Sequence, residues 1–224
     1  MRKQNYSSQA IIFDLDDTLY KEVDYVRSGF MAVAQHLGDD SLLDVMLKAR
    51  SKGINAFEAV KEQRPDAEIE KMIEIYRNHK PTITLPRETT LTLDYLHSKY
   101  TLALVTDGRS VGQRNKIEAL GLERYFAPED IVISEEFGSD KHSAANFKAI
   151  EKNHPGADFY FYIGDNPEKD FFRPNQLGWR TIMLEDVNHV NIHGQDNAPS
   201  IDHIAQYAIE SLCDAIAIVD ETEI

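Results

Sequence analysis

The chain has 224 residues, of which 42% are hydrophobic and 28% are charged. At about 150 residues per domain, this length predicts one large domain or one domain with an insertion, and the apolar content excludes a largely disordered chain. Acidic residues outnumber Lys and Arg by 38 to 24, giving a net charge of −14. That charge argues against general binding to nucleic acids, but not against a phosphate ligand held through a divalent cation.

The sequence also indicates the compartment. Its single cysteine, Cys213, excludes an internal disulfide and favours a reducing environment. No apolar run approaches the roughly 20 residues of a membrane helix, and the first apolar run, from Ala10, is too short for a signal peptide. We therefore expect a cytoplasmic protein without a membrane or nucleic-acid partner.

The expected elements change in kind along the chain. Residues 10–13 are continuously apolar, which predicts a strand buried on both faces of a parallel sheet. Apolar residues at helical spacing then predict helices near 30–37, 42–49 and 69–76. Afterwards the pattern alternates between helix and strand, with helices expected at 91–98, 111–120, 143–152 and 171–177, and strands at 102–105, 131–133, 159–163 and 181–184. The polar residues 186–200 predict a surface loop, and the tail suggests a short strand at 207–209 and a helix at 211–219.

This alternation predicts an α/β fold with a Rossmann-like parallel sheet and helices on both faces. The helices between residues 21 and 82 interrupt it, so we interpret them as an inserted helical cap domain, with residues 1–20 and 83–224 forming the core domain. The charges support this division, since the cap carries a net charge of −1 and the remainder −13.

Polar side chains follow the predicted strands. In open parallel sheets, ligands bind at the carboxyl ends of the strands, so residues in these positions are expected to converge. They are Asp14, Asp16 and Asp17 after the first strand, Thr106 and Asp107 after the second, Lys141 beyond the third, and Asp165, Asn166 and Asp170 after the fourth.

The chemistry of this set is specific. Several carboxylates in one site repel each other, and a hard cation such as Mg²⁺ relieves that repulsion. A lysine and a threonine beside them are suited to holding an anion. A metal, an anion pocket and a carboxylate that is not needed for other roles together suggest phosphoryl transfer to that carboxylate.

The motifs resemble those of the haloacid dehalogenase-like (HAD) hydrolase superfamily, in its phosphatase branch. Residues 14–18 resemble the first family motif, Asp-x-Asp-x-Thr, and Thr106 resembles the second, a Thr at the end of a strand. Lys141 resembles the third motif, a lone Lys, and residues 164–170 resemble the fourth, a Gly-Asp pair followed by a later Asp. All four occur in order, and the likeness extends over essentially the whole chain, including a cap between the first two motifs. One departure is His142, which stands where a Pro commonly follows the lysine.

The resemblance implies Mg²⁺-dependent hydrolysis of a small phosphomonoester, a nucleotide or a sugar phosphate, through an aspartyl-phosphate. Asp14 is implied as the nucleophile and Asp16 as the general acid and base. The implied metal ligands are Asp14, Asp165 and the backbone carbonyl of Asp16. Lys141, Thr106 and the Asp107 backbone N–H are implied to hold phosphate, with Asp170 and Asn166 in supporting roles. Residues 106–120 and 133–138 look similar to nucleotidase-like members, which makes a nucleotide plausible.

Several assignments stay open. Tyr20, Tyr25 and Arg27 follow the first motif and are candidates for substrate contact, as is Arg109, while Arg114 is as consistent with an exposed helix start. His189 and His193 are expected to be solvated loop residues, and Cys213 to pack in the core. Three alternatives remain: a phosphomutase, a receiver-type signalling module and a non-catalytic binding protein. The sequence does not indicate the oligomeric state.

Overall fold

A single parallel sheet organises the residues that the computed structural model describes, 8–196 and 198–223. In those residues six strands pair in the order β3-β2-β1-β4-β5-β6, and every pair is parallel. The strands are β1 (Gln9–Phe13), β2 (Thr101–Thr106), β3 (Ile131–Ile133), β4 (Phe159–Gly164), β5 (Arg180–Leu184) and β6 (Tyr207–Ile209). The expected Rossmann-like sheet is confirmed, and the order reverses beside β1, where such sheets form ligand sites.

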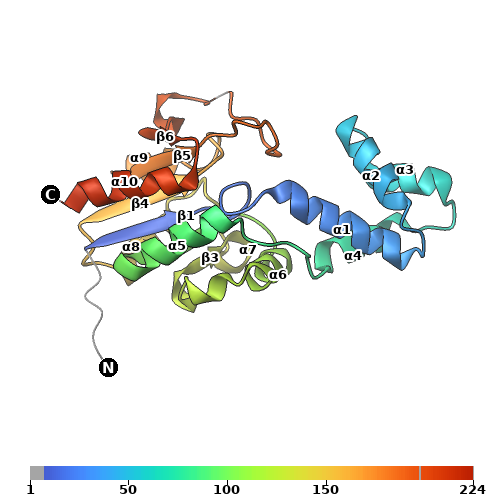
Figure 1. Cartoon of the computed structure of the whole chain (residues 1–224), viewed down its shortest axis with the longest axis horizontal. Helices are drawn as coiled ribbons and strands as arrows, with labels where there is room; N and C mark the ends of the chain where they lie inside the picture. Colours follow the sequence, from blue (N-terminus) through green and yellow to red (C-terminus); the bar gives the residue numbers. More distant parts are fainter. Residues whose placement is uncertain (1–7, 197, 224) are drawn as a thin grey trace. The chain divides into compact units, whose positions relative to one another are not determined.

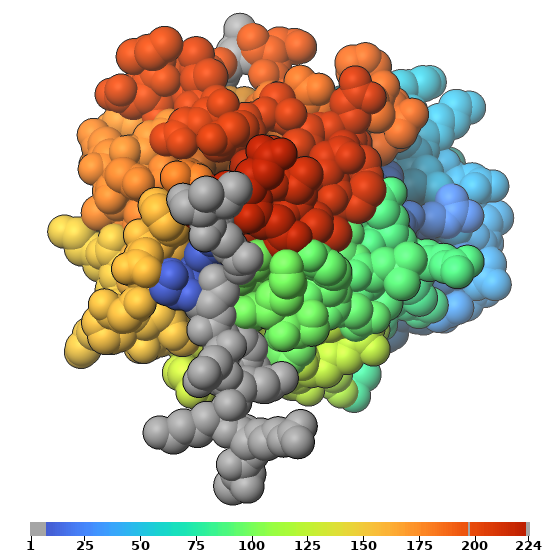
Figure 2. All heavy atoms as spheres, turned by 60° about the vertical axis from the view of Figure 1, so that its left-hand side comes forward, coloured from blue at the N-terminus to red at the C-terminus, as the bar shows by residue number. Residues whose placement is uncertain are grey.

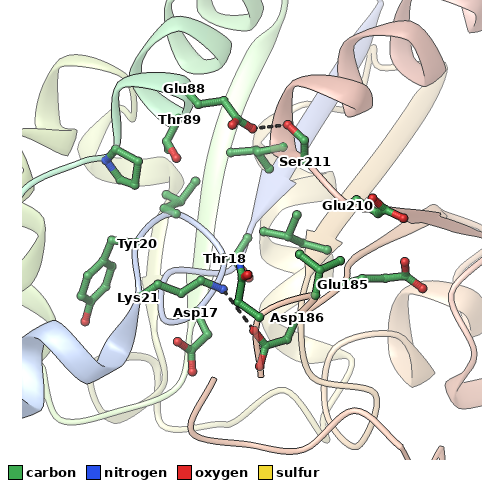
Figure 3. Close-up of a pocket in the computed structure, with 16 residues that line it drawn as sticks. Asp17, Thr18, Tyr20, Lys21, Glu88, Thr89, Glu185, Asp186, Glu210 and Ser211 are labelled. Carbon is green, nitrogen blue, oxygen red and sulfur yellow. Dashed lines mark hydrogen bonds and ion pairs between the residues drawn. The ribbon is translucent and has the colours of Figure 1, made fainter. Parts of the chain in front are cut away.

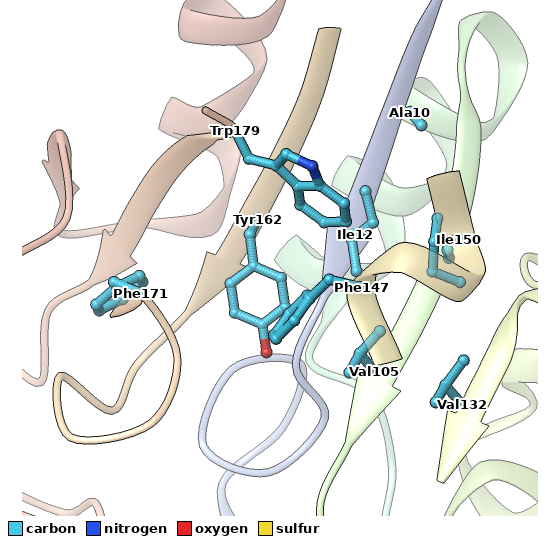
Figure 4. Close-up of a cluster of buried hydrophobic side chains, with 10 residues drawn as sticks. Ala10, Ile12, Val105, Val132, Phe147, Ile150, Tyr162, Phe171 and Trp179 are labelled. Atoms are coloured by element: carbon cyan, nitrogen blue, oxygen red, sulfur yellow. The ribbon is translucent and has the colours of Figure 1, made fainter. Parts of the chain in front are cut away.

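One face of the sheet packs against α8 (Ala145–Asn153). Ile12 of β1 and Tyr162 of β4 point to this face because successive residues of a strand alternate between faces. The Phe147 ring of α8 lies edge-on to Tyr162 and to Trp179, with ring centroids 5.4 and 5.6 Å apart (Figure 4). Tyr162 therefore joins the apolar core at its ring and, as described below, the polar site at its hydroxyl.

The other face is covered by α5 (Arg87–Lys99) and α10 (Ala215–Asp220), which lie side by side (Figure 1). Tyr95 of α5 and the adjacent Tyr100 donate hydrogen bonds to the Asp220 carboxylate of α10, both at 2.5 Å. The same two helices meet at the molecular surface, where the red C-terminal segment borders the green α5 segment (Figure 2).

Most of the remaining helices lie where the sequence predicts a helix, but they begin and end at different residues. They are α1 (Glu22–His36), α2 (Leu42–Ser51), α3 (Ala56–Gln63), α4 (Ile69–Asn78), α6 (Ser110–Leu120), α7 (Ser134–Phe137) and α9 (Phe172–Gln176), with short 3₁₀ turns at η1 (Leu122–Arg124), η2 (Pro128–Asp130), η3 (Ile201–His203), η4 (Leu212–Asp214) and η5 (Glu221–Glu223). Helices α3 and α7 were not predicted, because α7 has only four residues and the apolar stripe of α3 is short. Helix α3 begins after Asn55, whose side chain accepts hydrogen bonds from the N–H groups of Phe57 and Glu58.

The described chain forms two compact units. The sheet unit comprises residues through Glu22, Thr84–Ser110 and the chain from Gly121 onward, and the helical unit comprises Val23–Ile83 with Val111–Leu120. Most of α6 thus belongs to the helical unit, whereas the sequence-based division places it with the sheet. Inside the helical unit, Asn115 donates a hydrogen bond to the His79 carbonyl at 2.9 Å, and Lys116 lies 4.2 Å from the centre of the Tyr25 ring.

One expectation about burial is wrong. Cys213 is exposed, with its Sγ 3.0 Å from the Ser211 hydroxyl, and does not pack in the core. It lies in the 3₁₀ turn before α10, where Leu212 turns inward instead. In the described part of the chain, no helix combines the length and apolar character needed to cross a membrane.

Candidate active site

A cleft of about 110 Å³ lies within the sheet unit at the carboxyl ends of β1, β2 and β4. It brings together the residues that the four motifs singled out, although they are up to 156 positions apart in the sequence. The lining residues are Asp14, Asp16, Asp17, Glu22, Thr106, Asp107, Lys141, Asp165, Asn166, Lys169, Asp170 and His193.

Lys141 is the central cation of this cleft. Its ammonium donates hydrogen bonds to Asp14 Oδ1 at 2.5 Å and to Asp170 Oδ1 at 2.7 Å. The side chain is buried, which by itself lowers the pKa of a lysine, but the attraction of the two carboxylates outweighs burial and raises the pKa well above its ordinary value. Lys141 is therefore a fixed positive charge beside Asp14.

Asp170 is held from several directions. Its Oδ2 accepts hydrogen bonds from the N–H groups of Asp165 and Asn166, at 3.1 and 2.8 Å, and its Oδ1 accepts from the Tyr162 hydroxyl at 3.1 Å. Gly164 permits this approach, because a Cβ there would lie 2.5 Å from Asp170 Oδ2. Asp170 is thereby placed to orient Lys141 and the turn that carries Asp165.

Three carboxylates crowd together around this lysine. Oxygens of Asp14, Asp165 and Asp170 lie within 4.8 Å of one another, and all three side chains are buried. Burial raises the pKa of Asp14 to about 8, although Lys141 opposes the shift. Burial, together with the charges of Asp170 and Asp14, raises the pKa of Asp165 to about 9. Only one lysine faces these three carboxyl groups, so their fully ionised form needs a further positive charge such as that of a hard cation.

The segment after β1 shapes the entrance of the cleft. The Tyr20 hydroxyl donates a 2.5 Å hydrogen bond to Asp16 Oδ1, and the two residues form a parallel bridge. Tyr20 is buried, so its hydrogen bond fixes the position of the Asp16 carboxylate. Between them Asp17 adopts a positive φ of 57°, and its carboxylate accepts the Glu22 N–H at 2.9 Å. Asp14, Asp16 and Asp17 all line the cleft from this segment.

The segment after β2 forms the opposite wall. Thr106 is buried at the end of the strand. The Asp107 carboxylate accepts the backbone N–H of Lys141 at 3.1 Å, tying this loop to the lysine-bearing segment. Burial raises the pKa of Asp107, while the nearby charge of Lys141 opposes the shift.

The other candidate residues are placed differently. Arg109 is exposed and is not among the cleft-lining residues. Tyr25 is buried inside the helical unit against Tyr76 and His79, and Arg27 is exposed there. His189 is exposed in the loop after β5 with a φ of 54°. His193 is also exposed, but it lines the cleft.

Some groups that line the cleft or bond to a residue of its lining were not singled out from the sequence. Lys169 adds a second ammonium to the lining, and its position between two motif acids could have drawn attention to it. Asn191 donates a hydrogen bond to Asp165 Oδ2 at 2.9 Å, and Gln195 donates one to the Asp165 carbonyl at 2.8 Å. Both lie in the polar loop after β5, whose composition holds no sign of this role.

Comparison with known proteins identifies the family. The sequence profile described as "Haloacid dehalogenase-like hydrolase" matches residues 11–184, most of the chain. The chain therefore belongs to the haloacid dehalogenase-like hydrolases, and the resemblance drawn from the motifs is confirmed.

Two relatives match most of the chain. A "Glyceraldehyde 3-phosphate phosphatase" of Methanocaldococcus jannaschii is 28% identical over 94% of this chain and 96% of its own length. A protein of the same name from Methanothermobacter thermautotrophicus is 26% identical over 88% of this chain and 97% of its own. Among solved structures, a HAD hydrolase of Bacillus subtilis bound to magnesium superposes with a TM-score of 0.67 at 18% identity, covering 96% of this chain and 99% of that one. A 2-haloacid dehalogenase of Pseudomonas syringae superposes with a TM-score of 0.64 at 20% identity, over 96% and 99%.

Proposed function

We propose that the protein is a Mg²⁺-dependent phosphatase that hydrolyses a small sugar phosphate through a covalent phospho-Asp14 intermediate. The observation that carries the proposal is the cluster of Asp14, Asp165 and Asp170 around the buried Lys141 at the strand ends. Of the two substrate classes expected from the sequence, we favour sugar phosphates over nucleotides because both full-length relatives are named for a three-carbon sugar phosphate.

The residues present fit a magnesium ion. Asp14 and Asp165 supply carboxylate oxygens, which are the ligands that Mg²⁺ prefers, and a cation between them would offset the burial that raises both pKa values. We assign the ion to these two carboxylates and the Asp16 backbone carbonyl. Asp170 is a weaker candidate ligand, because both its oxygens already accept hydrogen bonds. When bound, the cation neutralises phosphate charge and favours the ionised form of Asp14.

Asp14 is the nucleophile in this scheme. Its carboxylate oxygen forms a bond to phosphorus while the ester P–O bond breaks, leaving an alkoxide that needs a proton. Lys141 favours the anionic form of Asp14 in the ground state and, with Thr106 and the Asp107 backbone N–H, holds the phosphate oxygens. The hydrogen bond that Lys141 donates to Asp170 keeps the ammonium in place through this step.

Asp16 acts first as the general acid and then as the general base. As a neutral acid it protonates the leaving alkoxide, and as a base it then takes a proton from the water that attacks phospho-Asp14 and releases phosphate. The Tyr20 hydroxyl donates a hydrogen bond to Asp16 Oδ1 and so orients the carboxyl group, which lines the cleft beside Asp14. General acid–base help of this kind contributes about 10²–10⁴ in rate.

A phosphate-release screen tests the proposal. The chain is incubated with glyceraldehyde 3-phosphate, other sugar phosphates and nucleoside monophosphates, each with Mg²⁺ and with chelator. Release from short sugar phosphates that disappears with chelator is expected. Conversion to an isomeric phosphate without release would identify a phosphomutase, and no reaction with any ester would support the non-catalytic alternatives.

A further inference from the structure

The loop after β5, residues 185–196, is attached to the catalytic cleft within the sheet unit. The Ile192 N–H donates a hydrogen bond to Asp17 Oδ2 at 2.9 Å. The Gln195 side-chain amide donates to the carbonyls of Asp165 and Leu184, at 2.8 and 2.9 Å. The loop is therefore fastened to the segments after β1 and β4, which both carry catalytic acids.

Asn191 makes the contact closest to the chemistry. Its Nδ2 donates a hydrogen bond to Asp165 Oδ2 at 2.9 Å. Within residues 8–196 and 198–223, this is the one hydrogen bond recorded for the Asp165 carboxylate. An amide N–H is a neutral donor, so it orients the carboxylate without the charge compensation that a lysine would provide. The other oxygen, Oδ1, stays available to a cation.

Lys21 determines which way the Asn191 amide faces. The Lys21 ammonium donates a hydrogen bond to Asn191 Oδ1 at 2.6 Å. An ammonium has only donors, so the amide oxygen must face Lys21 and the amide nitrogen must face Asp165. Lys21 in turn lies 3.9 Å from Asp186, toward which it extends from the segment after β1 (Figure 3).

Asp186 fastens the other side of the loop. Its carboxylate accepts the backbone N–H groups of Val190 and Asn191, at 3.1 and 2.8 Å. The Asn191 side chain is thus fixed at its backbone by Asp186 and at its amide oxygen by Lys21. Such fixed donors behind a metal ligand raise metal affinity by holding the ligand in a productive orientation.

We propose that Asn191 is a positioning residue for Asp165: it holds this carboxylate ready for the divalent cation, and Lys21 sets the orientation of its amide. The inference rests on the magnesium site of the proposed function. It adds to that site a residue that lies outside the four motifs and 26 positions beyond Asp165.

Calorimetric titration of the full-length chain with MgCl₂ measures the effect directly. Asn191→Ala is expected to raise the Kd for Mg²⁺ by roughly 10–100-fold, as loss of a partner behind a metal ligand does. Lys21→Met is expected to raise it by a smaller factor, because the amide stays present but can rotate. Asn188→Ala is the matched control, since Asn188 is exposed in the same loop and the hydrogen bond to the Asp165 carboxylate comes from Asn191 instead.

Steady-state kinetics separates positioning from a general structural defect. At saturating Mg²⁺, the kcat of Asn191→Ala should return close to the wild-type value, while the Mg²⁺ concentration for half-maximal rate rises in step with the Kd. An unchanged Kd in Asn191→Ala, or a lower kcat that Mg²⁺ does not restore, overturns the role of Asn191. If Asn191→Ala fails to fold, an unchanged Kd in Lys21→Met overturns it instead. Failure of the wild-type chain to bind Mg²⁺ overturns the metal site itself and the inference with it.

Discussion

Two clusters in the sheet unit use the same residue types with opposite electrostatic results. The catalytic cluster combines a lysine and a tyrosine with two carboxylates: Lys141, Tyr162, Asp14 and Asp170. The helix-joining cluster combines a lysine and two tyrosines with one carboxylate: Lys99, Tyr95, Tyr100 and Asp220. In the first, the pKa of Asp14 is raised to about 8, and in the second the pKa of Asp220 is lowered.

Burial and the ratio of acids to donors explain the difference. Burial dominates at Asp14, where one ammonium is shared between two carboxylates. At Asp220 burial also acts to raise the pKa, but hydrogen bonds from Tyr100, Tyr95 and Lys99 together outweigh it. In the helix-joining cluster the hydrogen bonds already stabilise the ionised carboxylate, and the cluster stabilises the fold. In the catalytic cluster a further positive charge is needed to stabilise the ionised carboxylates.

The largest effect is expected from Asp14, the proposed nucleophile. Asp14→Asn keeps the shape of the side chain but cannot attack phosphorus, so phosphate release should fall by roughly 10⁴-fold or more. Circular dichroism should show an intact fold, because asparagine has nearly the same shape and Lys141 keeps its ion pair with Asp170. Phosphate release at the wild-type rate would show that another group is the nucleophile.

Asp16 gives the next largest effect, and the leaving group should modulate it. Asp16→Asn should lower the rate with a sugar phosphate by about 10²–10⁴-fold, because the alkoxide then leaves without a proton. The loss of the first step should be much smaller with p-nitrophenyl phosphate, whose phenolate leaves readily. Burst kinetics with the two esters measures that step. Equal losses for both would rule out Asp16 as the acid.

Magnesium binding should depend on pH because of the raised carboxyl pKa values. With pKa values of about 8 and about 9, Asp14 and Asp165 bind protons near neutral pH in the metal-free chain, and the ion must displace them. We expect Mg²⁺ affinity to rise between pH 6 and pH 9, with protons released on binding. Calorimetry in two buffers of different ionisation enthalpy measures that release. An affinity independent of pH would show that the two carboxyls are already ionised.

Much of the catalytic cluster could be predicted from the sequence because its residues follow buried strands. An apolar run such as residues 10–13 predicts a central strand, and the topology then brings Asp14, Thr106 and Asp165 to one edge. The helix-joining cluster could not be predicted, because Tyr95 and Asp220 meet only through the packing of two helices 125 positions apart.

The same limit explains the errors and omissions. Asn191 reaches Asp165 from a loop whose polar composition indicates only exposure to solvent, so its contact depends on a loop path that no periodicity encodes. Cys213 sits in an apolar stretch, yet a short 3₁₀ turn directs it outward. Lys116 of α6 packs against Tyr25 although a motif-bearing loop of the sheet unit precedes that helix.

The smallest expected effect lies in the helix-joining cluster and concerns stability. Asp220→Asn removes the negative charge and one of the two oxygens that accept the Lys99 and tyrosine hydrogen bonds, and should lower the free energy of unfolding by about 1 kcal/mol, or roughly 2–4 °C in Tm. Catalysis should not change. Because the folded-state pKa of Asp220 is lowered, the ionised carboxylate stabilises the fold above its unfolded pKa of about 4, and this contribution is lost as the pH falls through the lower folded value. The Tm difference between wild type and variant should therefore be largest at neutral pH and should shrink below a pH of about 4. A Tm difference that stays unchanged in acid would show that packing, and not the charge of Asp220, provides the stabilisation.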